Sequence, residues 1–309
     1  MTFTRKGKIL DADTLRLPWF SKNAMVPVPW RKSDSTIRIF LTLCDERNVG
    51  RIGYVDVDAS DPGRILDYSK TPLIDVGAPG TYDDNGVVTS SVLEADGRLY
   101  QYYSGYELST KIPYKIFCGV AESLDGGETF RKLNKASILP PIDDELFNRC
   151  APYVRRDRSG GYRMFYLGDD GNTWRTDRNG HKVPMYTLKT LHSESPTRWP
   201  LEAGTLVMPF QTEEECGITL PNIWEDGGKF KMIYSIRRVN AGYTLGYAES
   251  DDGVRFVRRD EELAFAGERG EWESEMMCYA ELIAVDGRTY MFYCGNHYGM
   301  GGIGWAELS

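Results

Sequence analysis

The sequence predicts an all-β protein, a five-bladed β-propeller with four antiparallel strands in each blade. Two observations predict this fold: a hairpin-like segment recurs five times at a nearly constant interval, and helical patterns are almost absent. A third observation concerns the two ends of the chain and predicts that the N-terminal strand closes the last blade. A β-sandwich would not explain a regular four-strand period.

The recurring segment is a glycine-containing turn followed by an apolar strand, which is a hairpin signal. Clear copies are DGRLYQYYSG (96–105), SGGYRMFYLG (159–168), DGGKFKMIYS (226–235) and DGRTYMFYCG (286–295), with a weaker copy in DSTIRIFLTLC (34–44). Aligned on Ile39, Gln101, Met164, Met232 and Met291, the copies are 62, 63, 68 and 59 residues apart. Five such periods fill the 309 residues, so we expect a single domain over 1–309.

Each period also carries a strand before the hairpin and a third strand after it. The third strands end in similar motifs, CGVAES (118–123), LGYAES (245–250) and IGWAELS (303–309), and two of them continue into a fourth strand. The last period lacks a fourth strand, whereas FTRKGKIL (3–10) resembles the fourth strands of other periods. Because folded proteins cover strand edges, we expect residues 3–10 to pair with the last strand.

The amino-acid composition limits the kinds of binding partner and the cellular compartment that we expect for this protein. A net charge of −8 argues against a nucleic-acid partner, and no apolar run is long enough to span a membrane. No signal peptide is visible and the six cysteines form no C-x-x-C pair, so we expect a cytoplasmic protein with free thiols. The spacing of the three histidines supports no metal site, and no cofactor is predicted.

Connectivity divides the polar residues between the two ends of the propeller. Asp-rich turns gather at one end, where SLDGGETF (123–130) fits the Asp-box pattern, a turn device rather than a catalytic motif. Carboxylates, Arg, Asn, His and aromatic residues gather at the mouth of the channel on the other end. Such a mixture suits a small carbohydrate or another sugar-containing metabolite, because paired carboxylates can serve glycosyl transfer.

We expect Asp84 and Glu275 to form the catalytic carboxylate pair, with Glu215 assisting. The residues expected to hold the substrate are Asn23, Asp45, Asp83, Arg149, Asn222, Glu281, His297 and Tyr298. Structural roles remain open for several of these residues. The DDNG sequence at 83–86 is also a common turn, Glu275 could be solvated, and Glu281 could point into the channel or between blades.

The chain resembles a known family over essentially all five predicted blades, most specifically at residues 80–105 and 272–309. The motifs that carry the resemblance are GTYDDNGVVTSSV with GRLYQYYSG, the GYAESDDG turn, and ESEMMCY with RTYMFYCGNHYGMGGIGWAEL. They are similar to the five-bladed propeller proteins related to glycoside hydrolase families 32 and 43. The similarity is greatest to a cytoplasmic branch associated with polysaccharide and O-antigen biosynthesis. The resemblance implies the same fold and a carbohydrate substrate.

The residues that the resemblance would make catalytic are only partly present. Asn23 stands near the place of the first-blade Asp of those hydrolases, and Tyr153 stands where many family 43 enzymes carry a Glu after Ala-Pro. Three functions therefore stay open: an enzyme that cleaves or transfers a glycosyl group, a non-catalytic sugar or glycan-precursor binding protein, and a phosphate-dependent phosphorylase or transferase. A sialidase is disfavoured, because its arginine triad cannot be placed.

Overall fold

The protein is built almost entirely of β-strands, which the computed structural model describes over residues 1–169 and 174–309. The strands form successive antiparallel groups along the chain. The first comprises β2 (Ala24–Ser33), β3 (Thr36–Cys44), β4 (Gly50–Asp58) and β5 (Ile65–Tyr68). The second comprises β6 (Val87–Ala95), β7 (Arg98–Leu108), β8 (Tyr114–Ser123) and β9 (Arg131–Lys132).

The middle of the chain repeats this order. One group comprises β10 (Asn148–Arg156), β11 (Tyr162–Thr176), β12 (Lys182–Ser193) and β13 (Thr205–Leu206). The next comprises β14 (Glu215–Asp226), β15 (Lys229–Arg238), β16 (Ala241–Ser250) and β17 (Val257–Arg258). Short parallel contacts join β8 to β10 and β12 to β14, so that three groups form one continuous twelve-stranded sheet.

The last group joins the two ends of the chain. It comprises β19 (Cys278–Val285), β20 (Arg288–Cys294), β21 (Ile303–Leu308) and β1 (Thr2–Leu10), with β18 (Ala264–Ala266) on its outer edge. β1 pairs antiparallel with β21, from Phe3 opposite Leu308 to Leu10 opposite Ile303. The predicted pairing of residues 3–10 with the last strand is therefore confirmed.

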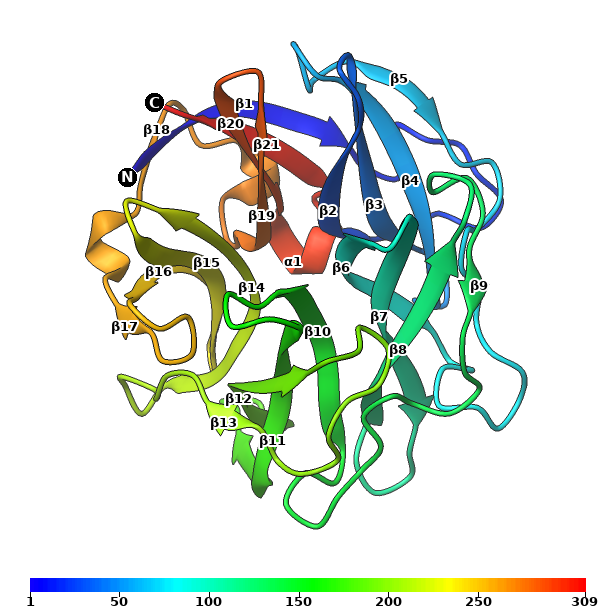
Figure 1. Ribbon diagram of the computed structural model, residues 1–309. Helices are drawn as coiled ribbons and strands as arrows, with labels where there is room; N and C mark the ends of the chain where they lie inside the picture. The colour runs from blue at the N-terminus through cyan, green and yellow to red at the C-terminus, as the bar shows by residue number, and fades with distance from the viewer.

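Figure 1 shows these groups arranged around a common centre, like the blades of a propeller. The first strands β2, β6, β10, β14 and β19 lie nearest the centre, where the short helix α1 (Asn296–Gly299) also lies. Two 3-10 turns, η1 (Asp260–Glu262) and η2 (Glu271–Glu273), connect β17 to β19. Within the described residues, no helix is long and apolar enough to cross a membrane.

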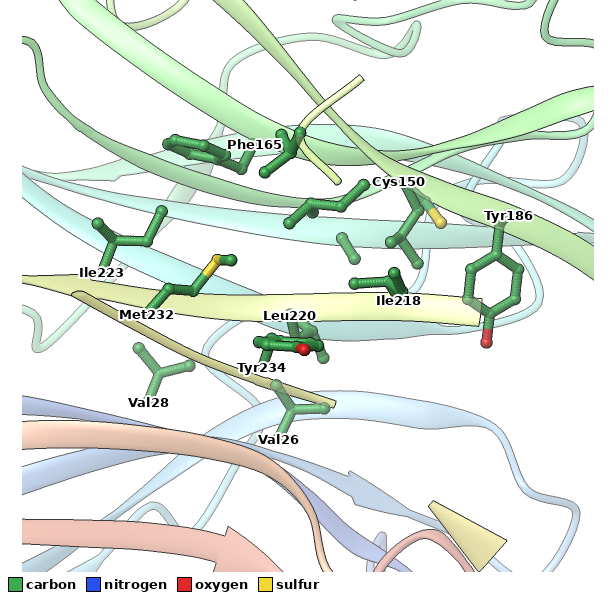
Figure 2. Close-up of a cluster of buried hydrophobic side chains, with 14 of the residues drawn as sticks. Val26, Val28, Cys150, Phe165, Tyr186, Ile218, Leu220, Ile223, Met232 and Tyr234 are labelled. Carbon is green, nitrogen blue, oxygen red and sulfur yellow. The ribbon is translucent and has the colours of Figure 1, made fainter. Parts of the chain in front are cut away.

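The repeat found in the sequence corresponds to the second strand of each group. Ile39, Gln101, Met164, Met232 and Met291 lie in β3, β7, β11, β15 and β20, and all five are fully buried. The largest buried cluster draws side chains from several groups, and Figure 2 shows part of it on β2, β10, β11, β12, β14 and β15. The core is therefore shared between neighbouring groups and holds the ring together.

The Asp-box is a turn, as the sequence predicts. The Asp125 carboxylate accepts hydrogen bonds from the backbone amides of Glu128 (3.1 Å) and Thr129 (3.0 Å) and from the Thr129 hydroxyl (2.6 Å). The bonds from Thr129 contribute most to lowering the pKa of Asp125 to about 2. Strand β11 continues to Thr176 and pairs with β12 on both sides of residues 170–173, whose side chains lie outside the described part of the chain.

Candidate functional site at the centre of the ring

Every first strand carries a β-bulge at the same place in the repeat. The pairing register shifts between Met25 and Val28, Thr89 and Ser91, Cys150 and Tyr153, Thr219 and Asn222, and Cys278 and Glu281. Four of these bulges contain a residue with left-handed backbone, namely Val26, Ala151, Leu220 and Tyr279. Bulges bend a strand and redirect its side chains, and these four residues line a central cavity together with Thr89 and Ser90 of the remaining bulge.

Hydrogen bonds between neighbouring groups fix four of the five bulges. The amides of Thr89, Ala151 and Tyr279 each donate to a hydroxyl at 2.8 Å, on Thr42, Ser104 and Ser235 of the preceding group. The amide of Val26 donates to Cys294 Sγ at 3.1 Å. At the fifth position the corresponding side chain is Leu167, which cannot accept. The floor of the cavity is thus held by side chains that the repeat supplies.

The cavity has a volume of about 690 Å³. Its apolar floor includes Val26, Ala151 and Leu220, and its polar wall includes the amides Asn23, Asn48, Asn85 and Asn148. Six tyrosines line it: Tyr106, Tyr114, Tyr186, Tyr243, Tyr279 and Tyr298. Arg47, Arg237 and His297 supply basic groups, whereas no described residue that lines the cavity is Asp or Glu.

Arg237 and the tyrosines form a continuous wall on one side. Arg237 donates to the Tyr186 hydroxyl at 3.4 Å, and that hydroxyl is hydrogen-bonded to the hydroxyl of Tyr243. The Tyr243 ring lies 5.5 Å from the Tyr279 ring and 5.7 Å from the Tyr298 ring, between centroids. This wall offers aromatic faces beside a positive charge.

The glycine-rich loop after β20 places His297 and Tyr298 at the mouth of the cavity. Both residues have left-handed backbone, with φ of 52° and 57°, which costs energy for residues other than glycine. The side-chain amide of Asn23 donates to the carbonyls of His297 (2.9 Å) and Tyr298 (3.1 Å). Asn23 therefore lines the cavity and also holds the loop in its strained shape.

The expected catalytic pair lies at the edge of this cavity, and neither carboxylate lines it. Asp84 accepts from the backbone amide of Gly80 at 2.8 Å and from Asn85, which does line the cavity. Glu275 is exposed, and its Oε2 lies 3.5 Å from His297 Nε2. The structure brings Glu275 together with His297, whereas Asp84 caps its own turn.

Three other predicted carboxylates are engaged in buried or local contacts. Glu215 is buried against Arg258, with distances of 2.7 and 3.0 Å, and Asp83 is buried against Lys132 at 2.6 Å. Asp45 accepts from the amides of Arg47 (2.9 Å) and Val49 (3.0 Å) and so shapes its own loop. None of the three lines the cavity.

Arg149 is fully buried and turned away from the cavity. It forms an ion pair with Glu145 at 2.6 Å and donates to the carbonyls of Pro140, Leu201 and Glu202. Because these contacts use the guanidinium within the protein, Arg149 stabilises the fold and does not face a ligand in the cavity.

Asn222 and Glu281 are brought together between β14 and β19, two residues beyond the bulge residues Leu220 and Tyr279, and neither lines the cavity. The Asn222 amide donates to Glu281 Oε2, whereas Glu281 Oε1 is buried without a hydrogen-bond partner. Burial raises the pKa of Glu281 well above its usual value, against a smaller opposing effect of Asn222. Of the two directions left open for Glu281, its contact with Asn222 shows that it points toward β14.

The sequence did not single out Arg237 or five of the six cavity tyrosines. A signal was nevertheless present: Ser235 lies three residues after Met232 of the repeat, and Arg237 lies two residues further along the same strand. Side chains at i and i+2 share a face of a strand, so the face that carries the bulge acceptor also carries Arg237. Cys44 and Tyr106 occupy the corresponding positions and also line the cavity. Among the described residues, no group of three or more His, Cys, Asp and Glu could hold a metal ion.

Comparisons with known proteins agree with this architecture. No protein-family model matches the chain. The protein Rv1502 of Mycobacterium tuberculosis is 28% identical over 309 residues, which cover 100% of this chain and 99% of that protein. The fold is similar to an α-L-arabinofuranosidase from Lactobacillus brevis (TM-score 0.70, 8% identity, 97% and 94% of the two chains). It is also similar to an endo-arabinase from Bacteroides thetaiotaomicron (TM-score 0.65, 14% identity, 98% of each chain). The chain thus has the all-β propeller fold found among glycoside hydrolases.

Proposed function

We propose that the central cavity binds a small sugar-containing molecule. The observation that carries this proposal is the lining: six tyrosines and several side-chain amides surround about 690 Å³ at the centre of the ring. Tyrosine rings offer an apolar face and a hydroxyl, which suits the mixed surface of a sugar. The names of the two solved structures, an arabinofuranosidase and an endo-arabinase, support a carbohydrate ligand.

Isothermal titration calorimetry with a panel of monosaccharides, sugar phosphates, nucleotide sugars and short oligosaccharides tests this proposal. Tyr279→Ala should weaken binding about tenfold, because it removes an aromatic face from the wall. Tyr68→Ala, on the outer strand β5, is the matched control and should bind like the wild type. Binding that is equally unaffected by both substitutions would place the ligand elsewhere.

A second candidate function is cleavage or transfer of a glycosyl group, which the contact between Glu275 and His297 favours. In this case Asp84 and Glu275 remain the proposed acid/base pair at the edge of the cavity. Glu215 assists indirectly, because its ion pair with Arg258 stabilises the fold around the site. Turnover should follow a bell-shaped pH profile. Turnover that survives both Asp84→Asn and Glu275→Gln would exclude this pair, and turnover that requires added phosphate would identify a phosphorylase.

We also propose that the chain is one domain with five blades, counting each antiparallel group as one blade and β1 as the closing strand. All six cysteines are free and buried, which supports a location in a reducing compartment such as the cytoplasm. A role in polysaccharide or O-antigen assembly follows from the resemblance, which is most specific at residues 80–105 and 272–309. Cell fractionation, and comparison of surface polysaccharide after deletion of the gene, would test these two points.

A further inference from the structure

Arg237 is a partly buried charge that no described carboxylate neutralises. Buried arginines elsewhere in the protein have acidic partners within 3.0 Å: Arg38 pairs with Asp56, Arg149 with Glu145 and Arg258 with Glu215. Arg237 contacts tyrosines instead, and its guanidinium carbon lies 5.8 Å from the ring centroid of Tyr186 and 6.0 Å from that of Tyr243. Within the described part of the chain, no Asp or Glu oxygen lies within 4.0 Å of its nitrogens.

An unpaired guanidinium is costly to hold away from water. Tyrosine faces offset part of that cost through cation–π contacts, but they leave most of its N–H donors unused. A guanidinium has a planar fork of donors that matches a carboxylate or a phosphate group. The other basic groups at the cavity, Arg47 and His297, lie at the exposed mouth, so the charge deepest in the wall is that of Arg237.

We propose that the ligand of the cavity is anionic, a sugar that carries a phosphate or carboxylate group, and that Arg237 binds this group. The inference rests on the proposed function, because it assigns a chemical class to the ligand of the same cavity. The hydroxyls of Tyr186 and Tyr243 are hydrogen-bonded to each other beside the guanidinium, which leaves the pair one further O–H donor for a ligand. Burial raises the pKa of Tyr186 to about 12, so its hydroxyl keeps its proton at neutral pH.

The tyrosines near Arg237 also indicate where the sugar ring of the ligand would lie. The Tyr243 ring lies near the guanidinium of Arg237 and also near the rings of Tyr279 and Tyr298. A sugar ring packed on Tyr279 would therefore lie beside the anionic group on Arg237. The lining carries no described carboxylate that would repel such a ligand.

The test compares glucose, glucose 6-phosphate, glucuronate, inorganic phosphate and acetate on the intact protein, by calorimetry and by the shift in melting temperature. The variants are Arg237→Gln, Arg237→Lys and the matched control Arg238→Gln. Arg238 is the next residue on β15, does not line the cavity, and donates to Thr244 at 2.8 Å. The phosphate and carboxylate probes distinguish the two sources of negative charge.

We expect at least one anionic probe to bind the wild type and Arg238→Gln equally, and about tenfold to a hundredfold more weakly to Arg237→Gln. Arg237→Lys keeps the charge but lacks the planar fork of donors, so its affinity for the anionic probe should lie between those of the wild type and Arg237→Gln. An intermediate affinity would show that the weaker binding of Arg237→Gln is not a folding defect. Glucose and glucose 6-phosphate binding equally to the wild type and to Arg237→Gln would overturn the anionic class but leave the sugar site intact. Failure of every sugar and anion to bind the wild type would overturn both proposals.

Discussion

Buried glutamates in this protein differ in what compensates their charge. Burial is the largest single effect on Glu215 and acts to raise its pKa, but the hydrogen bonds and charge of Arg258, with the Gln211 amide, together outweigh it, so the pKa of Glu215 is lowered. Glu281 has only the neutral amide of Asn222, so burial dominates and its pKa is raised. Replacing the carboxylate with a neutral amide should therefore change the free energy of unfolding in opposite directions at the two positions.

Replacing Glu281 with Gln should stabilise the protein at neutral pH. The raised pKa means that Glu281 contributes fully to stability below the pKa of the unfolded chain, about 4.3. That contribution is lost as the pH rises toward the folded pKa, at about 1.4 kcal/mol per pH unit. Urea unfolding between pH 4 and 8 should show a gap that widens with pH in favour of Glu281→Gln.

The control for this prediction is Glu261→Gln, an exposed carboxylate, which should leave the pH dependence unchanged. A constant difference between Glu281→Gln and the wild type across the pH range would contradict the raised pKa.

Replacing Glu215 with Gln should destabilise the protein by about 3 kcal/mol, because it leaves the buried guanidinium of Arg258 without its carboxylate. The neighbouring exposed Glu214→Gln is the control and should change the free energy of unfolding very little. If Glu215→Gln instead abolished turnover at unchanged stability, Glu215 would act directly in catalysis.

At the scale of elements, the bulges in the first strands turn a repeat of secondary structure into a site. Four of the five bulges have an acceptor from the preceding group, because the repeat supplies Thr42, Ser104, Ser235 and Cys294 in register. Because these acceptors are buried, their loss leaves an amide unsatisfied, which costs more than an exposed hydrogen bond.

Ser235→Ala should lower the free energy of unfolding by about 1–2 kcal/mol, because the amide of Tyr279 loses its acceptor. Ser35→Ala, in an exposed turn, is the matched control and should change stability by less than about 0.5 kcal/mol. Equal stabilities of the two variants in denaturant titrations would mean that the bulges are held by other contacts.

The loop over the cavity should store strain at His297. His297→Gly should be more stable than His297→Ala by about 1 kcal/mol, because glycine adopts the left-handed backbone without a Cβ penalty. Both variants lack the imidazole, so thermal unfolding of the pair isolates the backbone effect. Equal melting temperatures would show that the loop is relaxed.

At the scale of the whole molecule, the repeat was sufficient to predict the strand groups and the pairing of β1 with β21, because strand period and turn chemistry are local signals. The centre of the site was harder to predict. Arg149 and Glu215 lie close in sequence to cavity residues, but ion pairs with Glu145 and Arg258 bury them in the structure. Arg237 was missed because its strand face is recognised only once the hydrogen bond from the Tyr279 amide to Ser235 is known, and that bond joins residues far apart in the sequence.

The central claim is that the cavity at the centre of the ring is the sugar site and that Arg237 binds the anionic group. A crystal structure of the protein soaked with glucose 6-phosphate, or with the tightest anionic sugar found by calorimetry, tests it most directly. We predict density within the cavity, with the phosphate or carboxylate within hydrogen-bond distance of Arg237 and the sugar against Tyr279. A sugar bound elsewhere while the cavity holds only solvent would contradict the claim.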